Sequence, residues 1–210
     1  MGQLTAETNI KDGMNVCERA VKRCLDVMGA CVGLVLLSPV FLLIYLLLKK
    51  QGYGSVIFSQ ERIGYKGLPF RIYKFRTMCE ESEVDGLPRL AEKDDVRLTP
   101  VGKYLRVYHL DELPQLWNVL KGDMSFVGPR PERRYFIDLI MEETSDYEYI
   151  YLMRPGLTSK ATLHNGYTDT MEKMLIRLRM DLDYLRRRSL WLDTKIIFTT
   201  TIYLLTGKKF

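Results

Sequence analysis

A run of 22 residues from Val27 to Leu48 carries no charged side chain, and no other feature of the sequence constrains the fold as strongly. A helix of about 20 apolar residues is long enough to cross a bilayer. Lys49 and Lys50 end the run without a small-residue cleavage pattern, so a removable signal peptide is disfavoured. The sequence therefore predicts a membrane helix over residues 16–50, preceded by a flexible polar lead-in at 1–15.

Ser38 and Pro39 interrupt the middle of this run. Proline has no backbone N–H and clashes with the preceding turn, so a helix bends or breaks there. Basic residues flank the run at both ends and leave the positive-inside rule little bias to act on. The residues alone leave two topologies open, which are a kinked helix that crosses the bilayer and a re-entrant helix that turns back at Ser38-Pro39.

The sequence beyond residue 50 predicts an α+β domain that is mainly helical. Strand-forming residues at 55–60 and 70–78, separated by glycines, predict a small β-hairpin. Periodic apolar residues predict several amphipathic helices, over 99–108, 110–120, 131–148 and 168–188.

Two stretches, 79–97 and 154–166, show no regular apolar pattern. A further helix is predicted over 190–205, and it is more apolar than the amphipathic helices above. The charged residues 79–97 predict a surface loop that either covers a site or has no function, and 154–166 is rich in turn residues. Residues 190–205 are apolar but include Asp193 and Lys195, which leave too short a run to cross a bilayer. They predict a helix that lies in the membrane interface.

Lysine and arginine total 31 residues against 26 aspartate and glutamate residues, which gives a formal net charge of +5. This balance suits phosphates, acidic ligands or an anionic membrane surface. A nucleic-acid partner is not expected, because the basic residues alternate with acidic ones and do not form one stripe.

The four cysteines form no CxxC pair, which argues against a zinc site and a disulfide framework. Cys17, Cys24 and Cys31 recur every seven residues, a spacing that places them on one stripe of a helix. We expect them to be small residues that pack against a neighbouring helix.

Asp111 and Glu112 stand at the predicted start of the helix over 110–120. Free backbone N–H groups and the positive end of the helix dipole make such a position suitable for anions, although acidic residues are common there for structural reasons alone. Adjacent helical residues point about 100° apart, which suits two carboxylates that meet one metal-bound phosphate. Magnesium is the expected ion, since it prefers hard oxygen ligands.

Several basic residues are candidates for phosphate binding around this carboxylate pair. Arg130 lies between Pro129 and Pro131, which restrict the backbone on both sides of its planar guanidinium group. The other candidates are Lys74 and Arg76 on one strand face, Arg106 one helical turn before Asp111, and Arg154 before Pro155-Gly156. Each of these residues, taken alone, is also typical of a solvated surface. Neither a nucleophilic triad nor a P-loop or GxGxxG phosphate cradle is present in the sequence.

From Lys22 to Lys209 the chain resembles the bacterial sugar transferases known as monotopic phosphoglycosyl transferases, in their short single-domain form. The stretches that carry the resemblance are Lys22 to Asp26, the Ser38-Pro39 break, Ser55 to Gly64, Tyr73 to Met78, and the long stretch from Leu110 to Pro131. The turn at 159–166 departs from the commoner family pattern, so the resemblance gives no sugar preference.

The resemblance implies a re-entrant helix at 16–50 that is hinged at Ser38-Pro39. Residues 51–210 would form a catalytic domain, with its interfacial C-terminal helix, on the cytoplasmic face of the bacterial inner membrane. Such enzymes transfer a sugar 1-phosphate from a UDP-sugar to polyprenyl (undecaprenyl) phosphate, release UMP and depend on magnesium. This transfer is the first membrane step in the assembly of capsule, exopolysaccharide or glycoprotein glycans.

The resemblance also assigns roles to the candidate residues. Asp111 would be the nucleophile that holds the phosphosugar, and Glu112 would hold the metal or manage the proton of the acceptor. Lys74, Arg106 and Arg130 would balance phosphate charge, with Arg76 and Arg154 as secondary candidates. Membrane lipids are expected partners and a homo-oligomer is left open.

The alternative interpretation is a non-catalytic basic scaffold that binds acidic lipids at a membrane surface. It also accounts for the net positive charge and for the apolar segments at both ends of the chain. It leaves the Asp111-Glu112 pair unexplained. UMP release from a UDP-sugar discriminates between the two.

Overall fold

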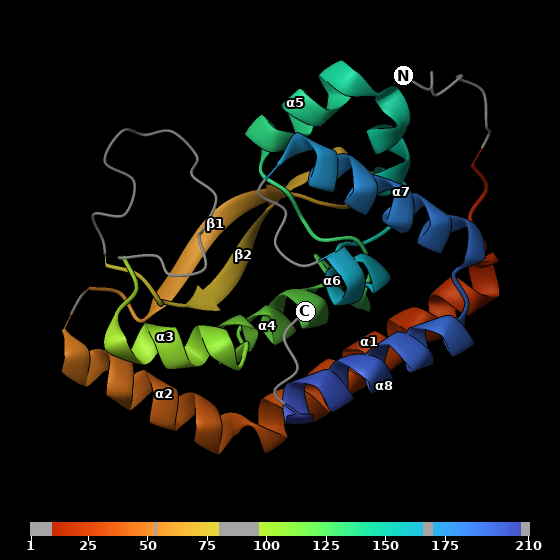
Figure 1. The fold of residues 1–210 in the computed structure, drawn as a ribbon. Helices are drawn as coiled ribbons and strands as arrows, with labels where there is room; N and C mark the ends of the chain where they lie inside the picture. Colours follow the sequence, from red (N-terminus) through yellow and green to blue (C-terminus); the bar gives the residue numbers. More distant parts are fainter. Residues whose placement is uncertain (1–9, 53, 80–96, 166–169, 207–210) are drawn as a thin grey trace.

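The computed structural model describes residues 10–52, 54–79, 97–165 and 170–206, most of which are helical (Figure 1). The α-helices are α1 (Val16–Leu36), α2 (Ser38–Gln51), α3 (Pro100–Val107), α4 (Gln115–Lys121), α5 (Arg134–Glu143), α6 (Lys160–Asn165), α7 (Met171–Arg187) and α8 (Leu190–Thr206). The 3-10 turns are η1 (Tyr65–Gly67), η2 (Leu110–Glu112) and η3 (Ser145–Leu152), and the strands are β1 (Ile57–Ile63), β2 (Pro69–Phe75), β3 (Ser125–Val127) and β4 (Gly156–Thr158). The prediction of a mainly helical α+β fold with a small hairpin is confirmed.

Helices α1 and α2 meet at Leu37 with a bend of 59°. Pro39 cannot donate a backbone hydrogen bond to Val35, four residues earlier. The Ser38 hydroxyl donates to the Val35 carbonyl instead, over 2.8 Å. The predicted break at Ser38-Pro39 is confirmed, and the residue beside the proline replaces the bond that the proline removes.

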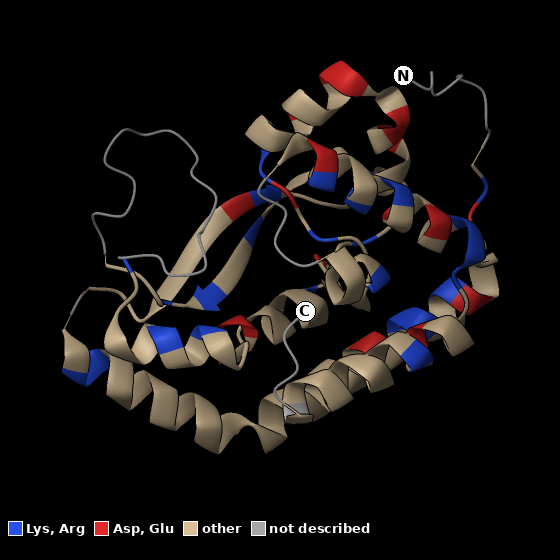
Figure 2. Cartoon of the chain, viewed as in Figure 1, with Lys and Arg blue, Asp and Glu red and all other residues tan. Residues whose placement is uncertain are grey.

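No single helix among the described residues is long and apolar enough to span a membrane, but α1 and α2 taken together meet both criteria. They form a wide V; α8 runs alongside the α1 arm, and the hairpin and helices α3 to α7 lie on the side toward which both arms rise (Figure 1). Figure 2 shows no charged residue around the apex or along α2 before its end. Leu36, Leu42 and Leu43 expose more than half of their surface on these helices.

Strands β1 and β2 form the predicted hairpin, an antiparallel pair in which Ile57 faces Phe75 and Ile63 faces Pro69. Strand β1 continues three residues beyond its predicted end, and the Ile63 N–H donates to the Glu132 carbonyl over 3.1 Å. Residues 80–96, most of the predicted surface loop, lie outside the described residues. The positions that flank them are held together by a bridge between Met78 and Leu98.

A proline divides the helix that the sequence predicts over 110–120. Pro114 has no N–H to donate to Leu110, and the chain forms the 3-10 turn η2 before α4 begins at Gln115. Asp111 and Glu112 therefore lie in this short turn, and the prediction that they open an α-helix is wrong. The helix predicted over 131–148 also ends early, because Thr144 is extended and its hydroxyl accepts a hydrogen bond from the Asp146 N–H, which starts η3.

A short parallel pair of strands, β3 and β4, is present in stretches for which the sequence predicts no strand. Ser125 pairs with Gly156 and Val127 with Thr158. The backbones touch beyond the ladder, where a Cβ atom on Gly128 would lie 2.3 Å from the Arg154 carbonyl oxygen. Only glycine fits such an approach. The contact holds together the start of the Gly128–Glu132 turn and the Arg154 region.

The largest apolar cluster joins α5, η3 and α7, and its buried members include Ile137, Ile140, Tyr147, Leu178, Leu182 and Leu185. A second cluster connects α1 to β2 and α4 through Ala30, Ile72, Val119 and Met124. A third connects α2 to β2 and α3 through Ile44, Leu48, Phe75 and Leu105. The bent helix pair is thus packed onto the elements that carry the candidate site.

Residues 10–15 are anchored, so the prediction of a flexible lead-in over 1–15 is wrong for this part; residues 1–9 are outside the described residues. Ile10 and Met14 are buried, and the Gly13 N–H donates to the Leu185 carbonyl over 2.9 Å. The Asp12 carboxylate accepts a hydrogen bond of 2.6 Å from Arg188 Nε.

The cysteine stripe on α1 does not pack against another helix, contrary to the sequence-based expectation. Cys17, Cys24 and Cys31 are all exposed. The face of α1 that packs contains Gly29 and Ala30, and a Cβ atom on Gly29 would lie 2.8 Å from the Phe126 ring. Glycine and alanine, rather than cysteine, permit the close approach.

Candidate active site

The carboxylate pair Asp111-Glu112 lies in η2, between α3 and α4. The turn follows His109, which has a left-handed backbone with φ of 54°. A non-glycine residue in this region costs about 1–3 kcal/mol, and such strain is frequent at functional sites. The His109 carbonyl accepts a hydrogen bond of 3.2 Å from the Glu112 N–H, which closes the turn. No pattern in the sequence reveals this conformation.

Glu112 is paired with cations from two distant segments. Its Oε1 lies 2.6 Å from Lys74 Nζ on β2 and 3.8 Å from Arg130 Nη2 in the turn after β3. The structure therefore brings Glu112, Lys74 and Arg130 together. Two positive charges face one carboxylate here.

Asp111 is buried, and its Oδ1 has no hydrogen-bond partner among the described residues. The Nη1 atom of Arg106 is likewise buried without a hydrogen-bond partner in this part of the chain. A buried polar atom without a partner is costly, so a ligand that accepts from Arg106 and contacts Asp111 would remove two such costs.

The two acids differ in their protonation. Burial raises the pKa of Asp111 to about 6; the Glu112 charge acts in the same direction, and Lys74 and Arg106 oppose it. Burial also disfavours the charged form of Glu112, but the Lys74 and Arg130 charges outweigh it and lower the pKa of Glu112 to about 2. Glu112 is thus the stronger acid of the two, and Asp111 keeps its proton to a higher pH.

Asn118 holds the two halves of the site together, and the sequence-based reasoning missed it. The side chain is completely buried. Its Oδ1 accepts from the Tyr73 N–H over 3.1 Å, and its Nδ2 donates to the Arg71 carbonyl over 2.7 Å. These bonds fasten α4 to β2 and so hold Lys74 opposite Glu112. A polar residue between the apolar positions Trp117 and Val119 was the available signal.

The contacts described for Arg76 and Arg154 are with groups other than the carboxylates of Asp111 and Glu112. Arg76 is buried and donates to the carbonyls of Ser55, over 2.8 Å, and Leu48, over 3.1 Å, which ties the end of α2 to the hairpin. Arg154 Nε donates to the Gly122 carbonyl over 2.9 Å, and its guanidinium group lies 5.0 Å from the centre of the Tyr65 ring. The contacts described for both side chains are structural.

The described residues contain no group of three or more histidine, cysteine, aspartate and glutamate side chains placed to hold a metal ion. The Asp111-Glu112 pair offers two carboxylates, and the partnerless Asp111 Oδ1 is an oxygen atom that a hard cation could take as a ligand. Magnesium is usually bound by one or two carboxylates together with substrate phosphates and water. The residues present are therefore sufficient for an ion that arrives with a phosphate substrate.

The family model described as "Bacterial sugar transferase" matches residues 17–207. A UDP-N-acetylgalactosamine-undecaprenyl-phosphate N-acetylgalactosaminephosphotransferase from Aeromonas hydrophila is 43% identical over 187 residues, which are 89% of this chain and 44% of that protein. A UDP-glucose:undecaprenyl-phosphate glucose-1-phosphate transferase from Caulobacter vibrioides is 44% identical over 188 residues, covering 88% of this chain and 70% of that one.

An Escherichia coli protein that bears the same name as the Caulobacter one is 42% identical over 184 residues, covering 87% of this chain and 39% of that protein. The chain thus spans less than half of the Aeromonas and Escherichia relatives. The family match covers the bent helix pair, the hairpin and η2. The chain belongs to the bacterial sugar transferase family.

Proposed function

We propose that the protein transfers a sugar 1-phosphate from a UDP-sugar to undecaprenyl phosphate and releases UMP. The named relatives act on UDP-sugars and undecaprenyl phosphate. The observation that carries the proposal is the arrangement in η2, where a buried Asp111 with a partnerless oxygen adjoins Glu112, which is already paired with Lys74 and faces Arg130. Phosphoryl transfer needs mainly positioning and charge neutralisation, and this arrangement supplies both.

In the proposed first step, a carboxylate oxygen of Asp111 attacks the phosphorus that bears the sugar. The bond from this phosphorus to the oxygen of UMP breaks, UMP leaves with the electron pair, and the phosphosugar stays on Asp111. In the second step, an oxygen of undecaprenyl phosphate attacks the same phosphorus and releases the Asp111 carboxylate. Lys74, Arg106 and Arg130 would neutralise the phosphate oxygens in both steps.

Magnesium would be held by Asp111 and Glu112 together with phosphate oxygens of the donor. When bound, it would withdraw charge from the diphosphate and make UMP a better leaving group. Glu112 suits this role because its pKa of about 2 keeps it ionised.

We further propose that α1 and α2 form a re-entrant membrane helix, which keeps both ends of the V on the cytoplasmic side of the bacterial inner membrane. The apex is uncharged, and Lys49 and Lys50 end the second arm. Helix α8 would lie at the interface, with Trp191 and Phe198 exposed toward lipid. The candidate site would then face the water side of the leaflet that holds the acceptor.

The purified full chain in detergent or nanodiscs is tested with undecaprenyl phosphate, magnesium and a panel of UDP-sugars. Release of UMP from at least one donor, dependent on Asp111, supports the proposal and names the sugar. Binding to anionic vesicles without UMP release from any donor supports a basic membrane scaffold instead.

A further inference from the structure

We propose that Glu132, held between Arg62 and Arg177, is a positioning residue for Arg130; this inference rests on the proposed transferase function. Glu132 follows Arg130 by two residues in the turn that leads from β3 to α5. Its carboxylate lies 2.8 Å from Arg177 Nη1 on α7 and 3.6 Å from Arg62 Nη1 on β1. The bridge joins three segments that are distant in the sequence.

The turn from Gly128 to Glu132 has few backbone groups by which it can be held. Pro129 and Pro131 have no N–H. The turn is instead held mainly by hydrogen bonds that its carbonyl oxygens accept. The Gly156 N–H donates to the Pro129 carbonyl over 2.9 Å, and Arg62 Nη1 donates to the Pro131 carbonyl over 3.2 Å.

The bond from the Ile63 N–H to the Glu132 carbonyl and the carboxylate bridge hold the end of the turn. Arg62 therefore fixes both the backbone and the side chain that follow Arg130.

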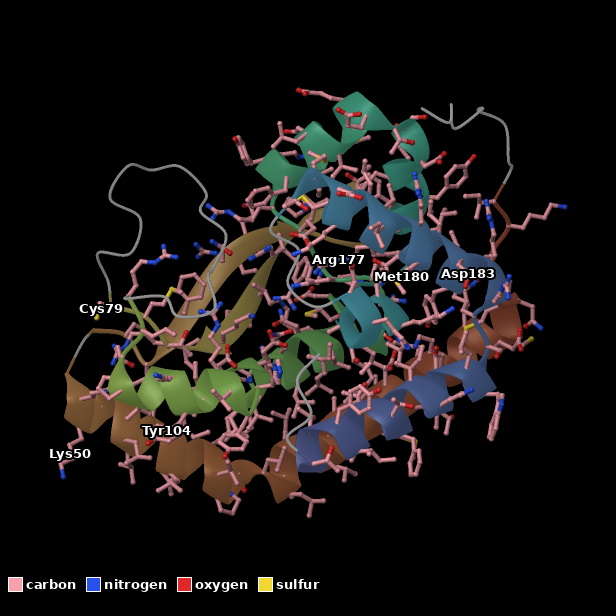
Figure 3. All side chains as sticks on the ribbon, in the orientation of Figure 1. Lys50, Cys79, Tyr104, Arg177, Met180 and Asp183 are labelled. Atoms are coloured by element: carbon pink, nitrogen blue, oxygen red, sulfur yellow. The ribbon has the colours of Figure 1, made fainter. Side chains whose placement is uncertain are left out.

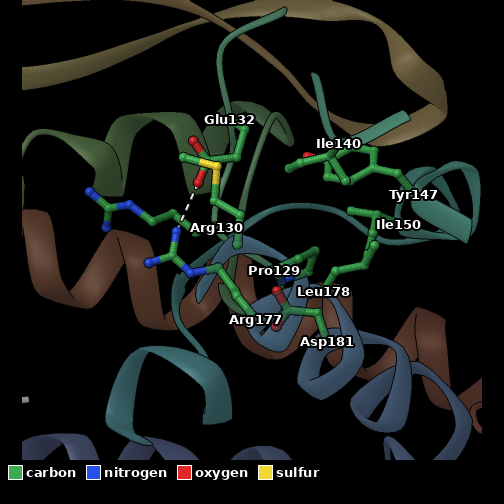
Figure 4. A pocket seen from close by; sticks show the side chains of 10 residues that line it. Pro129, Arg130, Glu132, Ile140, Tyr147, Ile150, Arg177, Leu178 and Asp181 are labelled. Carbon is green, nitrogen blue, oxygen red and sulfur yellow. Dashed lines mark hydrogen bonds and ion pairs between the residues drawn. The ribbon is translucent and has the colours of Figure 1, made fainter. Parts of the chain in front are cut away.

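Packing behind the turn is incomplete. A small cavity of about 20 Å³, with room for about one water molecule, is lined by Pro129, Arg130, Glu132 and side chains of α5, η3 and α7 (Figure 4). Figure 3 locates Arg177 on α7, and Figure 4 shows its ion pair with Glu132 beside Arg130. Because apolar packing does not fill this space, the ion pairs of Glu132 with Arg62 and Arg177 contribute more to fixing the position of the turn.

The position of the turn sets the position of the Arg130 guanidinium group, which is 3.8 Å from the Glu112 carboxylate. A misplacement of about 1 Å near reacting groups can lower a rate about 100-fold. Replacing a buried ion-pair network by well-packed apolar residues often changes the free energy of unfolding little. Stability alone is therefore a weak explanation for the charged side chains of Glu132, Arg62 and Arg177. Accurate placement of Arg130 is the function that the geometry supports.

The test is a double-mutant cycle with Glu132→Gln, Arg130→Ala and the double variant, measured as UMP release by the full chain. If Glu132 acts through Arg130, Glu132→Gln lowers turnover about 10- to 100-fold in the wild-type background and less than about threefold when Arg130 is alanine. Asp183→Asn is the matched control. It removes a carboxylate of α7 that also meets two cations, Lys160 at 3.1 Å and Arg187 at 2.8 Å, and it should leave turnover unchanged.

Equal losses in both backgrounds, or full turnover in Glu132→Gln, would refute the positioning role. If Glu132→Gln does not fold, the same cycle is run with Arg177→Lys, which keeps the charge and loses the planar fork, and it is judged by the same criterion. Absence of UMP release from the wild type refutes the transferase function itself, which separates the two failures.

Discussion

Lys74 Nζ lies 2.6 Å from the Glu112 carboxylate, although 38 residues separate the two in the sequence. The neighbouring Asp111 has a carboxylate oxygen without any hydrogen-bond partner in the described chain. Two adjacent acids therefore have different surroundings: Glu112 is neutralised by the protein, and Asp111 is left to interact with a ligand. This difference supports distinct roles in the proposed transfer.

Asp111→Asn should abolish both turnover and covalent labelling, because a carboxamide is a poor nucleophile toward phosphorus. We expect a loss of roughly four orders of magnitude or more, as for other removed nucleophiles. Glu112→Gln should slow turnover steeply but still permit slow labelling of Asp111. Mass spectrometry of enzyme quenched after incubation with UDP-sugar and magnesium, without acceptor, followed by peptide mapping, locates the adduct. An adduct on Glu112 would reverse the two roles.

Arg130→Lys should lower kcat/KM about 10- to 100-fold, the loss expected for a charged hydrogen bond, since lysine keeps the charge but not the planar fork. The fold should be unchanged, as judged by thermal unfolding in detergent. Arg133→Lys, in the same turn region, serves as the control. Wild-type turnover in Arg130→Lys would assign this residue to surface structure.

The rate of adduct formation should fall as the pH drops below about 6, because burial raises the pKa of Asp111 to about 6 and only the ionised carboxylate attacks. Glu112, with a pKa of about 2, should contribute nothing in this range. The measurement is the second-order rate constant for labelling between pH 4.5 and 8, at concentrations of UDP-sugar and magnesium well below saturation, because the free enzyme then sets the pH dependence. A rate that stays flat down to pH 4.5 contradicts a raised pKa at the nucleophile.

Asp181 on α7 should make the protein less stable as the pH rises. Burial raises the pKa of its carboxyl group to about 7, with Glu132 acting in the same direction and Arg177 opposing it. A raised folded-state pKa gives stability that is complete below the unfolded value near 3.8 and is lost as the pH rises through about 7. Because one pKa unit is worth about 1.4 kcal/mol, the loss is at most about 4 kcal/mol.

Between pH 5 and pH 8 the Tm of the wild type should fall further than the Tm of the Asp181→Asn variant, which retains the smaller contribution of Asp111. Thermal unfolding of both proteins at the two pH values is the measurement. An equal decrease of Tm in the two proteins would place the titrating group elsewhere.

Single cysteines at Lys11 and Ser55, both exposed, should be labelled from the same side of the membrane if the helix pair is re-entrant. The background for this experiment lacks the native cysteines. Pro39→Leu restores an N–H that can bond to Val35, so it should straighten the helix and move the two positions to opposite sides in part of the molecules. Labelling of wild-type positions 11 and 55 from opposite sides would show a helix that crosses.

Local sequence features predicted the hairpin and the helix break, because both depend on residues within a few positions. The Ser38-Pro39 pair removes and replaces a hydrogen bond inside one turn, and the glycines between β1 and β2 permit the reversal. The division of η2 from α4 was also local, since Pro114 is visible in the sequence, but apolar periodicity across it obscured the boundary.

Contacts between distant segments could not be predicted. The β3 and β4 pair joins stretches about 30 residues apart, and Arg62, Glu132 and Arg177 meet only after the whole domain has folded. The same holds for Arg76. The strand pattern predicted that it lies on the same face as Lys74, but in the structure its guanidinium group donates hydrogen bonds to the carbonyls of Leu48 and Ser55. The sequence indicated the candidate residues of the site, and the tertiary fold determined which of them are in contact.

Asp193 interrupts the apolar helix α8, and in the structure it accepts hydrogen bonds of 2.5 Å from both Lys22 on α1 and Tyr184 on α7. The lysine and the aspartate are 171 residues apart. During synthesis, Lys22 emerges from the ribosome long before the carboxylate that neutralises it. Contacts of such separation form late and slowly. Helix α1 therefore spends most of translation without this partner, and α8 completes its packing.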